Sequence, residues 1–187
     1  MALDQTLPNL WLISDARNDA HLEAALRALP RESGFIYRHY HLPDPDRWQR
    51  FQALRRVAEA CGHMVVLADS AMTATEWGAH GVYGAPLALW PRRTGLVQLA
   101  TAHNPREIAQ AARKGADAVL LSPAFVTRSH PDAPALGPAR FRLMAQLSPI
   151  PIIALGGMTP KTADRLRWPM WAAIDGLSQP SVSPHTP

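Results

Sequence analysis

Short apolar runs recur eight times along the chain, and most are followed by a segment whose apolar residues have helical spacing. The runs lie at residues 11–14, 34–38, 63–68, 81–84, 95–100, 116–121, 151–155 and 171–175. Continuous apolar runs are typical of strands covered on both faces, and such strands belong to parallel sheets. The sequence therefore predicts an α/β protein with a parallel sheet.

Helical spacing occurs between these runs, in residues 19–29, 46–60, 105–114, 138–147 and 160–166. Asn104 precedes Pro105, and Thr159 precedes Pro160. Each pair places a capping side chain ahead of a proline at the first helical position, which is a start signal. The strand runs and helical segments therefore alternate along the chain.

Eight alternations of strand and helix predict a compact (β/α)8 TIM barrel, with an open Rossmann-like sheet as the alternative. Residues 86–94 are too few for a full helix with its loops, so the helix between the fourth and fifth strands is expected to be missing or much reduced. We expect a single barrel domain over residues 1–178. The polar, proline-rich residues 179–187 are expected to form a disordered tail.

Length and composition favour one soluble domain that binds a small molecule. A chain of 187 residues supports one sizeable core and is too short for two ordinary domains. The net charge of +4 is scattered, which does not favour nucleic acid but suits an anionic small molecule. The single cysteine, Cys61, excludes an intrachain disulfide and indicates a reducing compartment. Without a signal peptide pattern or a long apolar run, we expect a cytoplasmic protein and no membrane contact.

Polar residues follow most of the apolar runs, at the ends where TIM barrels carry their active sites. The candidates are Asp15, Arg38, His39, Tyr40, Asp69, Ser70, Tyr83, Thr101, His103, residues 122–130, Gly156, Gly157, Asp175 and Gly176. Any one of them alone is more often a loop cap or a solvated side chain. Their recurrence after eight strands predicts a site at the mouth of the barrel.

Two loops have the chemistry of an anion site. Gly156 and Gly157 stand between the seventh strand and a helix start, where backbone N–H groups can approach a phosphate closely. The alternative for this pair is a tight turn that needs positive φ. After the sixth strand, Thr127, Arg128 and Ser129 offer hydrogen-bond donors for phosphate oxygens.

His130 completes this loop and is a further donor when it is protonated. A polar loop placed directly after an apolar strand is therefore interpreted as the phosphate-facing wall of the site. The loop is expected to donate hydrogen bonds to phosphate oxygens opposite the glycine turn.

Five blocks carry a resemblance to a known family. They are LWLISDA, VVLADSAMTATEWGAHGVYG, ATAH, ADAVLLSPAFVTRSHPDAPALG and IPIIALGGMTP. In this order, from about residue 10 to 178, the chain resembles the thiamine phosphate synthase and TenI superfamily. The resemblance implies a (β/α)8 barrel. In the synthase branch it implies the joining of hydroxymethylpyrimidine diphosphate to a thiazole phosphate, with pyrophosphate released in the presence of Mg²⁺.

The resemblance also implies roles for individual residues. Arg38 matches the arginine of the family's Gln-Leu-Arg-Glu-Lys strand end, and His130 stands in place of a diphosphate-binding lysine; both are interpreted as catalytic. Asp69 matches a magnesium-binding aspartate. Ala68 replaces the neighbouring asparagine, and YGAPLALW contains no second metal carboxylate.

Further positions match the family's substrate-binding residues. They are Thr101 and His103 in the Ser-Ala-His stretch, Thr127 and Ser129 at two hydroxyl positions with Arg128 between them, and Gly156 and Gly157 at the thiazole-phosphate turn. Asp175 falls where the family presents a serine to that phosphate, and its carboxylate would repel the anion.

The missing metal ligands keep an alternative open. The chain is then a TenI-like homologue that acts as a thiazole tautomerase, or that binds a phosphorylated ligand in a regulatory role. TenI proteins use a histidine in the sixth-strand loop, and His130 lies several residues beyond that position. His39, His63 and His80 have no acid partner at useful sequence spacing and are interpreted as structural or surface residues. Exposed tryptophan around Trp90 would indicate a homodimer contact.

Overall fold

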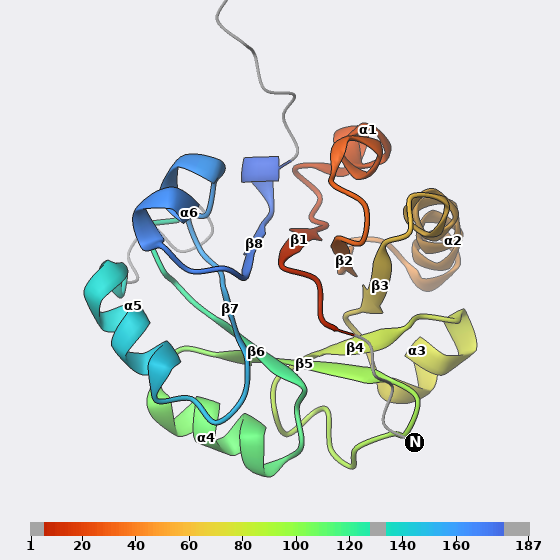
Figure 1. Cartoon of the computed structure of the whole chain (residues 1–187). Helices are drawn as coiled ribbons and strands as arrows, with labels where there is room; N and C mark the ends of the chain where they lie inside the picture. Colours follow the sequence, from red (N-terminus) through yellow and green to blue (C-terminus); the bar gives the residue numbers. More distant parts are fainter. Residues whose placement is uncertain (1–5, 128–133, 178–187) are drawn as a thin grey trace, which may run out of the picture.

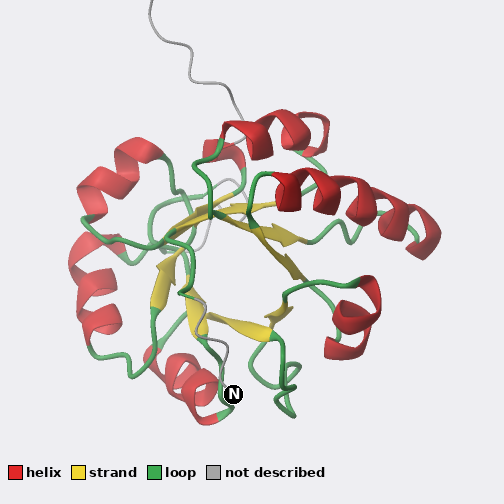
Figure 2. Cartoon of the chain, turned by 45° about the vertical axis from the view of Figure 1, so that its right-hand side comes forward, coloured by secondary structure: helices red, strands yellow, loops and turns green. Residues whose placement is uncertain are grey.

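The computed structural model describes residues 6–127 and 134–177, and these form a closed barrel of eight parallel strands (Figures 1 and 2). The strands are β1 (Leu10–Ile13), β2 (Gly34–Tyr37), β3 (Met64–Leu67), β4 (Gly81–Gly84), β5 (Val97–Ala102), β6 (Ala118–Leu121), β7 (Ile152–Ala154) and β8 (Trp171–Ala173). Each pairs with the next in the chain, and β1 pairs with β8 to close the ring. The predicted TIM barrel is confirmed, and the open Rossmann-like sheet is excluded.

Helices surround this ring on the outside (Figure 2). They are α1 (Leu22–Ala28), α2 (Asp44–Ala60), α3 (Ala71–Trp77), α4 (Pro105–Arg113), α5 (Gly137–Gln146) and α6 (Pro160–Leu166), with 3-10 turns η1 (Asp19–His21) and η2 (Asp175–Leu177). The two predicted start signals are confirmed. The Asn104 side chain accepts a hydrogen bond from the Glu107 N–H at 3.0 Å, and Thr159 forms a capping box with Thr162.

The strand side chains alternate between two apolar layers. One layer fills the barrel and includes Trp11 and Ile13, whereas Leu12 between them packs outward against the helices. Gly34 lies beside Trp11 on the neighbouring strand, and a Cβ atom there would sit 2.1 Å from an indole carbon. A glycine at this position therefore makes room for the largest side chain inside the barrel.

The connection between β4 and β5, residues 85–96, contains no helix, as the sequence predicts. Leu89 and Leu96 are buried there and close the outer side of the barrel. Leu87 and Trp90 are exposed, and the Lys114 Nζ atom lies 4.4 Å from the centre of a Trp90 ring. The homodimer contact expected around Trp90 stays a prediction.

Within the described ranges, no helix is both long enough and apolar enough to cross a lipid bilayer. The predicted tail, residues 179–187, lies outside the described residues, as do Arg128, Ser129 and His130. The domain boundary at residue 178 also stays a prediction.

Candidate functional site

Two adjoining hollows open at the carboxyl ends of the strands. The first has a volume of about 260 Å³, and its lining includes seven residues of the predicted site, namely Arg38, Tyr83, Thr101, His103, Ser122, Thr127 and Gly156. The second has a volume of about 450 Å³ and includes Gly157, Arg17 and Asp175. Thr127, Leu155, Gly156 and Ile174 line both. The fold thus brings predicted residues from the ends of β2, β4, β5, β6, β7 and β8 to one continuous mouth.

The glycine turn after β7 owes its composition to conformation and to close packing. Gly156 and Gly157 have φ of +93° and +64°, the left-handed region that favours glycine. A Cβ atom on Gly157 would lie 2.4 Å from the Val126 carbonyl oxygen. The Phe125 N–H donates to the Gly156 carbonyl at 3.0 Å, so the loop after β6 lies directly on the turn. The alternative of a tight turn with positive φ is confirmed, and anion binding by its amides stays a prediction.

Arg38, at the end of β2, is held from three sides. Its N–H donates to Ser14 Oγ at 2.8 Å, its carbonyl accepts from Arg47 Nε at 3.2 Å, and its Nη2 donates to Asp15 Oδ2 at 2.8 Å. Its Nε is buried without a hydrogen-bond partner among the described residues. An unsatisfied donor of this kind, on a side chain that lines the cavity, is suited to an acceptor on a ligand.

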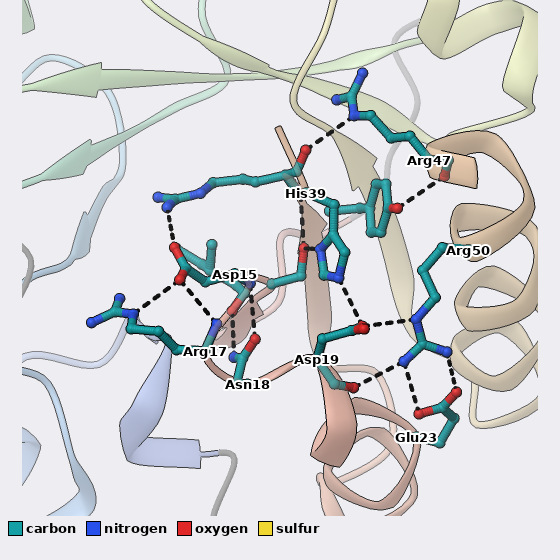
Figure 3. Close-up of polar contacts among 12 residues, drawn as sticks. Asp15, Arg17, Asn18, Asp19, Glu23, His39, Arg47 and Arg50 are labelled. Atoms are coloured by element: carbon teal, nitrogen blue, oxygen red, sulfur yellow. Dashed lines mark hydrogen bonds and ion pairs between the residues drawn. The ribbon is translucent and has the colours of Figure 1, made fainter. Parts of the chain in front are cut away.

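The buried His39 contacts Ser14, which accepts the Arg38 N–H, and so it helps to hold the backbone of Arg38 (Figure 3). Ser14 Oγ lies 2.8 Å from His39 Nδ1, and His39 Nε2 lies 2.8 Å from Asp19 Oδ1. Because the Asp19 carboxylate can only accept, Nε2 of the neutral ring carries the proton, and Nδ1 accepts a hydrogen bond from the Ser14 hydroxyl. Burial lowers the pKa of His39 against the opposing effect of Asp19. Ser14 is fully buried, so no substrate reaches this Ser-His-Asp series and its role is structural.

Two histidines, His39 and His80, have acid partners that lie far from them in the sequence. His39 pairs with Asp19, and His80 lies 3.7 Å from Glu59 on another part of the molecule. Neither acid is close to its histidine in the sequence, so these pairs form only in the folded chain. The structural interpretation of His39 agrees with its burial.

Asp69, the predicted metal ligand, is already paired. Arg47 donates to Asp69 Oδ2, and the Ser70 N–H donates to Oδ1 at 2.7 Å. Burial raises the pKa of Asp69, but the hydrogen bonds from Arg47 and Ser70 outweigh it and the pKa is lowered overall. Among the described residues, no three metal-ligating side chains come together. Ala68 offers no side-chain oxygen beside Asp69, and Asp69 itself is paired with Arg47, so the residues present do not fit a magnesium ion, which takes one or two carboxylates beside the phosphates of its substrate.

Arg17 is a site residue that the sequence did not reveal. Its Nη1 lies 3.3 Å from Asp175 Oδ2, and its Nε donates to Asp15 Oδ1 at 2.9 Å. With Arg38 on the other oxygen of Asp15, a chain of alternating charges runs across the mouth from Arg38 after β2 to Asp175 after β8. Figure 3 shows Arg17 beside Asp15. Burial raises the pKa of Asp15, but the two arginines outweigh it and lower the pKa overall. Arg17 also offsets the carboxylate of Asp175 in the second hollow.

His103 brings an ionisable ring to the first cavity. Its Nδ1 lies 3.0 Å from Glu107 Oε2, which also accepts from the His103 N–H at 2.7 Å. Burial raises the pKa of Glu107, but these hydrogen bonds outweigh it, so the carboxylate stays charged. With its Nδ1 proton donated to Glu107, the ring keeps an Nε2 lone pair that can accept a proton. Burial also raises the pKa of Tyr83 to about 12, so the cavity contains a neutral phenol.

Residues 10–174 match the family described as thiamine monophosphate synthase. The chain belongs to this family. It is 32% identical over 179 residues to a thiamine-phosphate synthase from Chloroflexus aurantiacus, which covers 90% of this chain and 82% of the relative. It is 30% identical over 162 residues to a thiamine-phosphate synthase from Methanoculleus marisnigri, covering 81% and 77%.

A solved structure supports the fold. The thiamine phosphate pyrophosphorylase from Pyrococcus furiosus superposes with a TM-score of 0.78 at 22% identity, covering 94% of this chain and 90% of that one. The family resemblance of the sequence blocks is thus confirmed, and so is the barrel that it implies.

Proposed function

We propose that this chain is a thiamine phosphate synthase-type transferase, which joins hydroxymethylpyrimidine diphosphate to a thiazole phosphate at the mouth of the barrel. Its support is the family match over residues 10–174. The observation that carries it is the pair of hollows that share Thr127 and Gly156, because two phosphorylated substrates must lie side by side for the transfer. Proximity of this kind is itself a large part of catalysis in two-substrate reactions.

The reaction breaks the C–O bond between the pyrimidine methylene carbon and the diphosphate, and the thiazole nitrogen forms a C–N bond to that carbon. Pyrophosphate leaves with the bonding electron pair. We assign Arg38 and Thr127 to the departing diphosphate, with Arg128, Ser129 and His130 from the same loop. The amides of Gly156 and Gly157 and the guanidinium of Arg17 are assigned to the thiazole phosphate.

No step is routed through magnesium, because the residues around Asp69 do not fit it. The negative charge that develops on the leaving diphosphate then falls to Arg38 and to the loop after β6 alone. We therefore expect a slower transfer than a metal-assisted one, since a metal ion contributes several kcal/mol of charge stabilisation.

The test is a coupled assay of thiamine phosphate formation from both substrates. We expect product with the wild-type chain, and a loss of about tenfold or more in the Arg38→Met variant, equivalent to about 1.4 kcal/mol of transition-state stabilisation. The exposed Arg140 is the matched control, and Arg140→Met should keep the wild-type rate. A wild-type chain that gives no product above background contradicts the proposal.

A second candidate is supported by His103 and Glu107. A carboxylate-held imidazole in a cavity is suited to metal-free proton transfer, as in a TenI-like thiazole tautomerase. Interconversion of thiazole carboxylate phosphate tautomers, followed by NMR, tests it. Loss of this activity in His103→Gln, with retention in the exposed control His21→Gln, would favour the tautomerase. Binding of the thiazole phosphate without either activity would instead indicate a ligand-binding or regulatory role.

A further inference from the structure

Arg47, in the first turn of α2, inserts its guanidinium at the carboxyl ends of β2 and β3. The residue is only 6% exposed. Its Nη1 donates to Asp69 Oδ2, its Nη2 to the Ala68 carbonyl at 2.9 Å, and its Nε to the Arg38 carbonyl at 3.2 Å. Each nitrogen of the guanidinium therefore has an acceptor, and all three acceptors lie just beyond the strands.

Aromatic rings hold this guanidinium in place. Its carbon lies 5.4 Å from the centre of the Trp77 ring, 5.6 Å from that of Tyr40 and 6.0 Å from that of Tyr37. These distances are typical of cation–π contacts, which favour a charged group in a partly dry site. The Tyr37 hydroxyl also donates to the Arg47 carbonyl at 2.9 Å, which anchors the backbone. Arg47 cannot leave Asp69 without losing several contacts at once.

This arrangement places any metal ion at Asp69 in direct competition with Arg47. One carboxylate oxygen is occupied by a cation that does not deprotonate in proteins, and the other accepts the Ser70 N–H. A divalent ion at Asp69 would stand next to a fixed positive charge, and the described part of the chain contains no group of three metal-ligating side chains. The guanidinium supplies the positive charge that a metal would otherwise bring to this carboxylate.

We infer that Arg47 is a built-in counter-ion that closes the Asp69 site to divalent cations, so that Asp69 is a structural partner and not a metal ligand. Through the Arg38 carbonyl, Arg47 is also a positioning residue for the cavity. This inference does not rest on the proposed transferase reaction, because metal binding can be measured directly on the full chain without substrates.

The experiment is a titration of the full chain with Mn²⁺ alone, followed by paramagnetic broadening of the Ser70 amide resonance in NMR. Ser70 donates to Asp69, so an ion on that carboxylate would broaden its signal. We expect the wild-type signal to stay sharp, including when Mn²⁺ binds elsewhere. A saturable loss of the Ser70 signal in the wild type, abolished in Asp69→Asn, would overturn the inference.

Arg47→Met supplies a readout that a purely structural role would not change. Removing the guanidinium frees the carboxylate, so Ser70 should broaden at Mn²⁺ concentrations that leave the wild type sharp. Arg50→Met is the matched control, since Arg50 lies on the same helix but pairs with Asp19 and Glu23. A Ser70 signal that responds alike in all three chains would show that Arg47 does not close the site. Should a variant fail to fold, the wild-type titration decides alone.

Discussion

The two sides of the barrel mouth are built from different chemistry. The side formed by the ends of β1, β2 and β3 carries charged residues that pair with one another, namely Asp15, Arg17, Arg38, Arg47 and Asp69. The side formed by the ends of β5, β6 and β7 carries hydroxyls and glycines, namely Thr101, Ser122, Thr127, Gly156 and Gly157. The charge is therefore concentrated on the side where it is already neutralised.

This difference separates the residues that shape the site from those that are available to a ligand. A neutralised charge offers little net attraction, because a ligand must compete with its existing partner. The β5–β7 side instead presents hydroxyls and backbone amides, which carry no net charge for a counter-ion to neutralise. Arg38 and Arg17 have both roles, since each pairs with Asp15 and also lines one of the two hollows. Single substitutions on either side of the mouth test this difference.

Gly157→Ala should cause the largest loss of unfolding free energy, because it disturbs the packing of the glycine turn on the β5–β7 side. The added methyl group meets the Val126 carbonyl, and the φ of +64° disfavours alanine. Gly95→Ala is the matched control, with a φ of +85° and nothing within 4 Å. Both lose about 1–2 kcal/mol of unfolding free energy through φ, and the clash removes about 1–3 kcal/mol more from Gly157→Ala alone. Urea unfolding measures the difference, and equal losses would contradict the packing argument.

Asp69→Asn should have the next largest effect, on the opposite side. It leaves the buried Arg47 without its counter-ion, a loss that costs ~3–5 kcal/mol in a fully buried pair. Because Asp69 is 28% exposed, we expect about 2 kcal/mol of unfolding free energy to be lost. Glu59→Gln removes the surface partner of Arg55 and should cost about 0–1 kcal/mol. A loss no larger than that of the control would show that Arg47 does not depend on Asp69.

The fold was accessible from the sequence because its signals are local. Eight apolar runs and the proline-preceding caps at Asn104 and Thr159 mark where strands and helices begin. The short stretch between β4 and β5 excluded a helix by length alone. The observed strands lie within a few residues of the predicted runs, which is the usual uncertainty at element ends.

The pairing of charges at the mouth was not accessible in the same way. Arg47 has the sequence environment of a solvated helix face, and only the fold shows that it turns inward to Asp69. The place of Arg17 in the site is not visible in the sequence, because its partner Asp175 lies near the other end of the chain. Family motifs located Arg38, Asp69 and the glycine turn, but a motif does not report which oxygens are already occupied.

Asp175→Ser should have a moderate effect on ligand affinity. It removes a carboxylate from the second hollow and releases Arg17 from that partner. We expect the affinity for a thiazole phosphate to rise about fivefold, equivalent to about 1 kcal/mol for an exposed charge. The exposed Asp164 on α6 is the control, and Asp164→Ser should leave the affinity unchanged. An affinity that falls in Asp175→Ser would place the ligand's phosphate elsewhere.

The smallest expected effect is the contribution of His39, on the charged side, to the pH dependence of the unfolding free energy. Burial lowers its pKa in the folded chain, so between the ordinary value of about 6.5 and the lowered one the unfolded chain binds more protons. Its contribution is complete above about pH 6.5 and is lost as the pH falls below that value. Protonation acts on a ring that faces Asp19, His41 and Arg50.

Unfolding free energies measured between about pH 7 and pH 5 test this, above the range in which the carboxylates titrate. His39→Gln should flatten the slope, and the exposed control His21→Gln should not. An unchanged slope in His39→Gln would assign the pH dependence to another group.

The most direct test of the whole comparison is a calorimetric titration of the full chain with a thiazole phosphate, once in EDTA and once in excess Mg²⁺. If the hydroxyls and glycines of the β5–β7 side hold the ligand, and the charges of the β1–β3 side pair with one another, the affinity for the thiazole phosphate is the same in both buffers. Binding that appears only with Mg²⁺ would contradict the account.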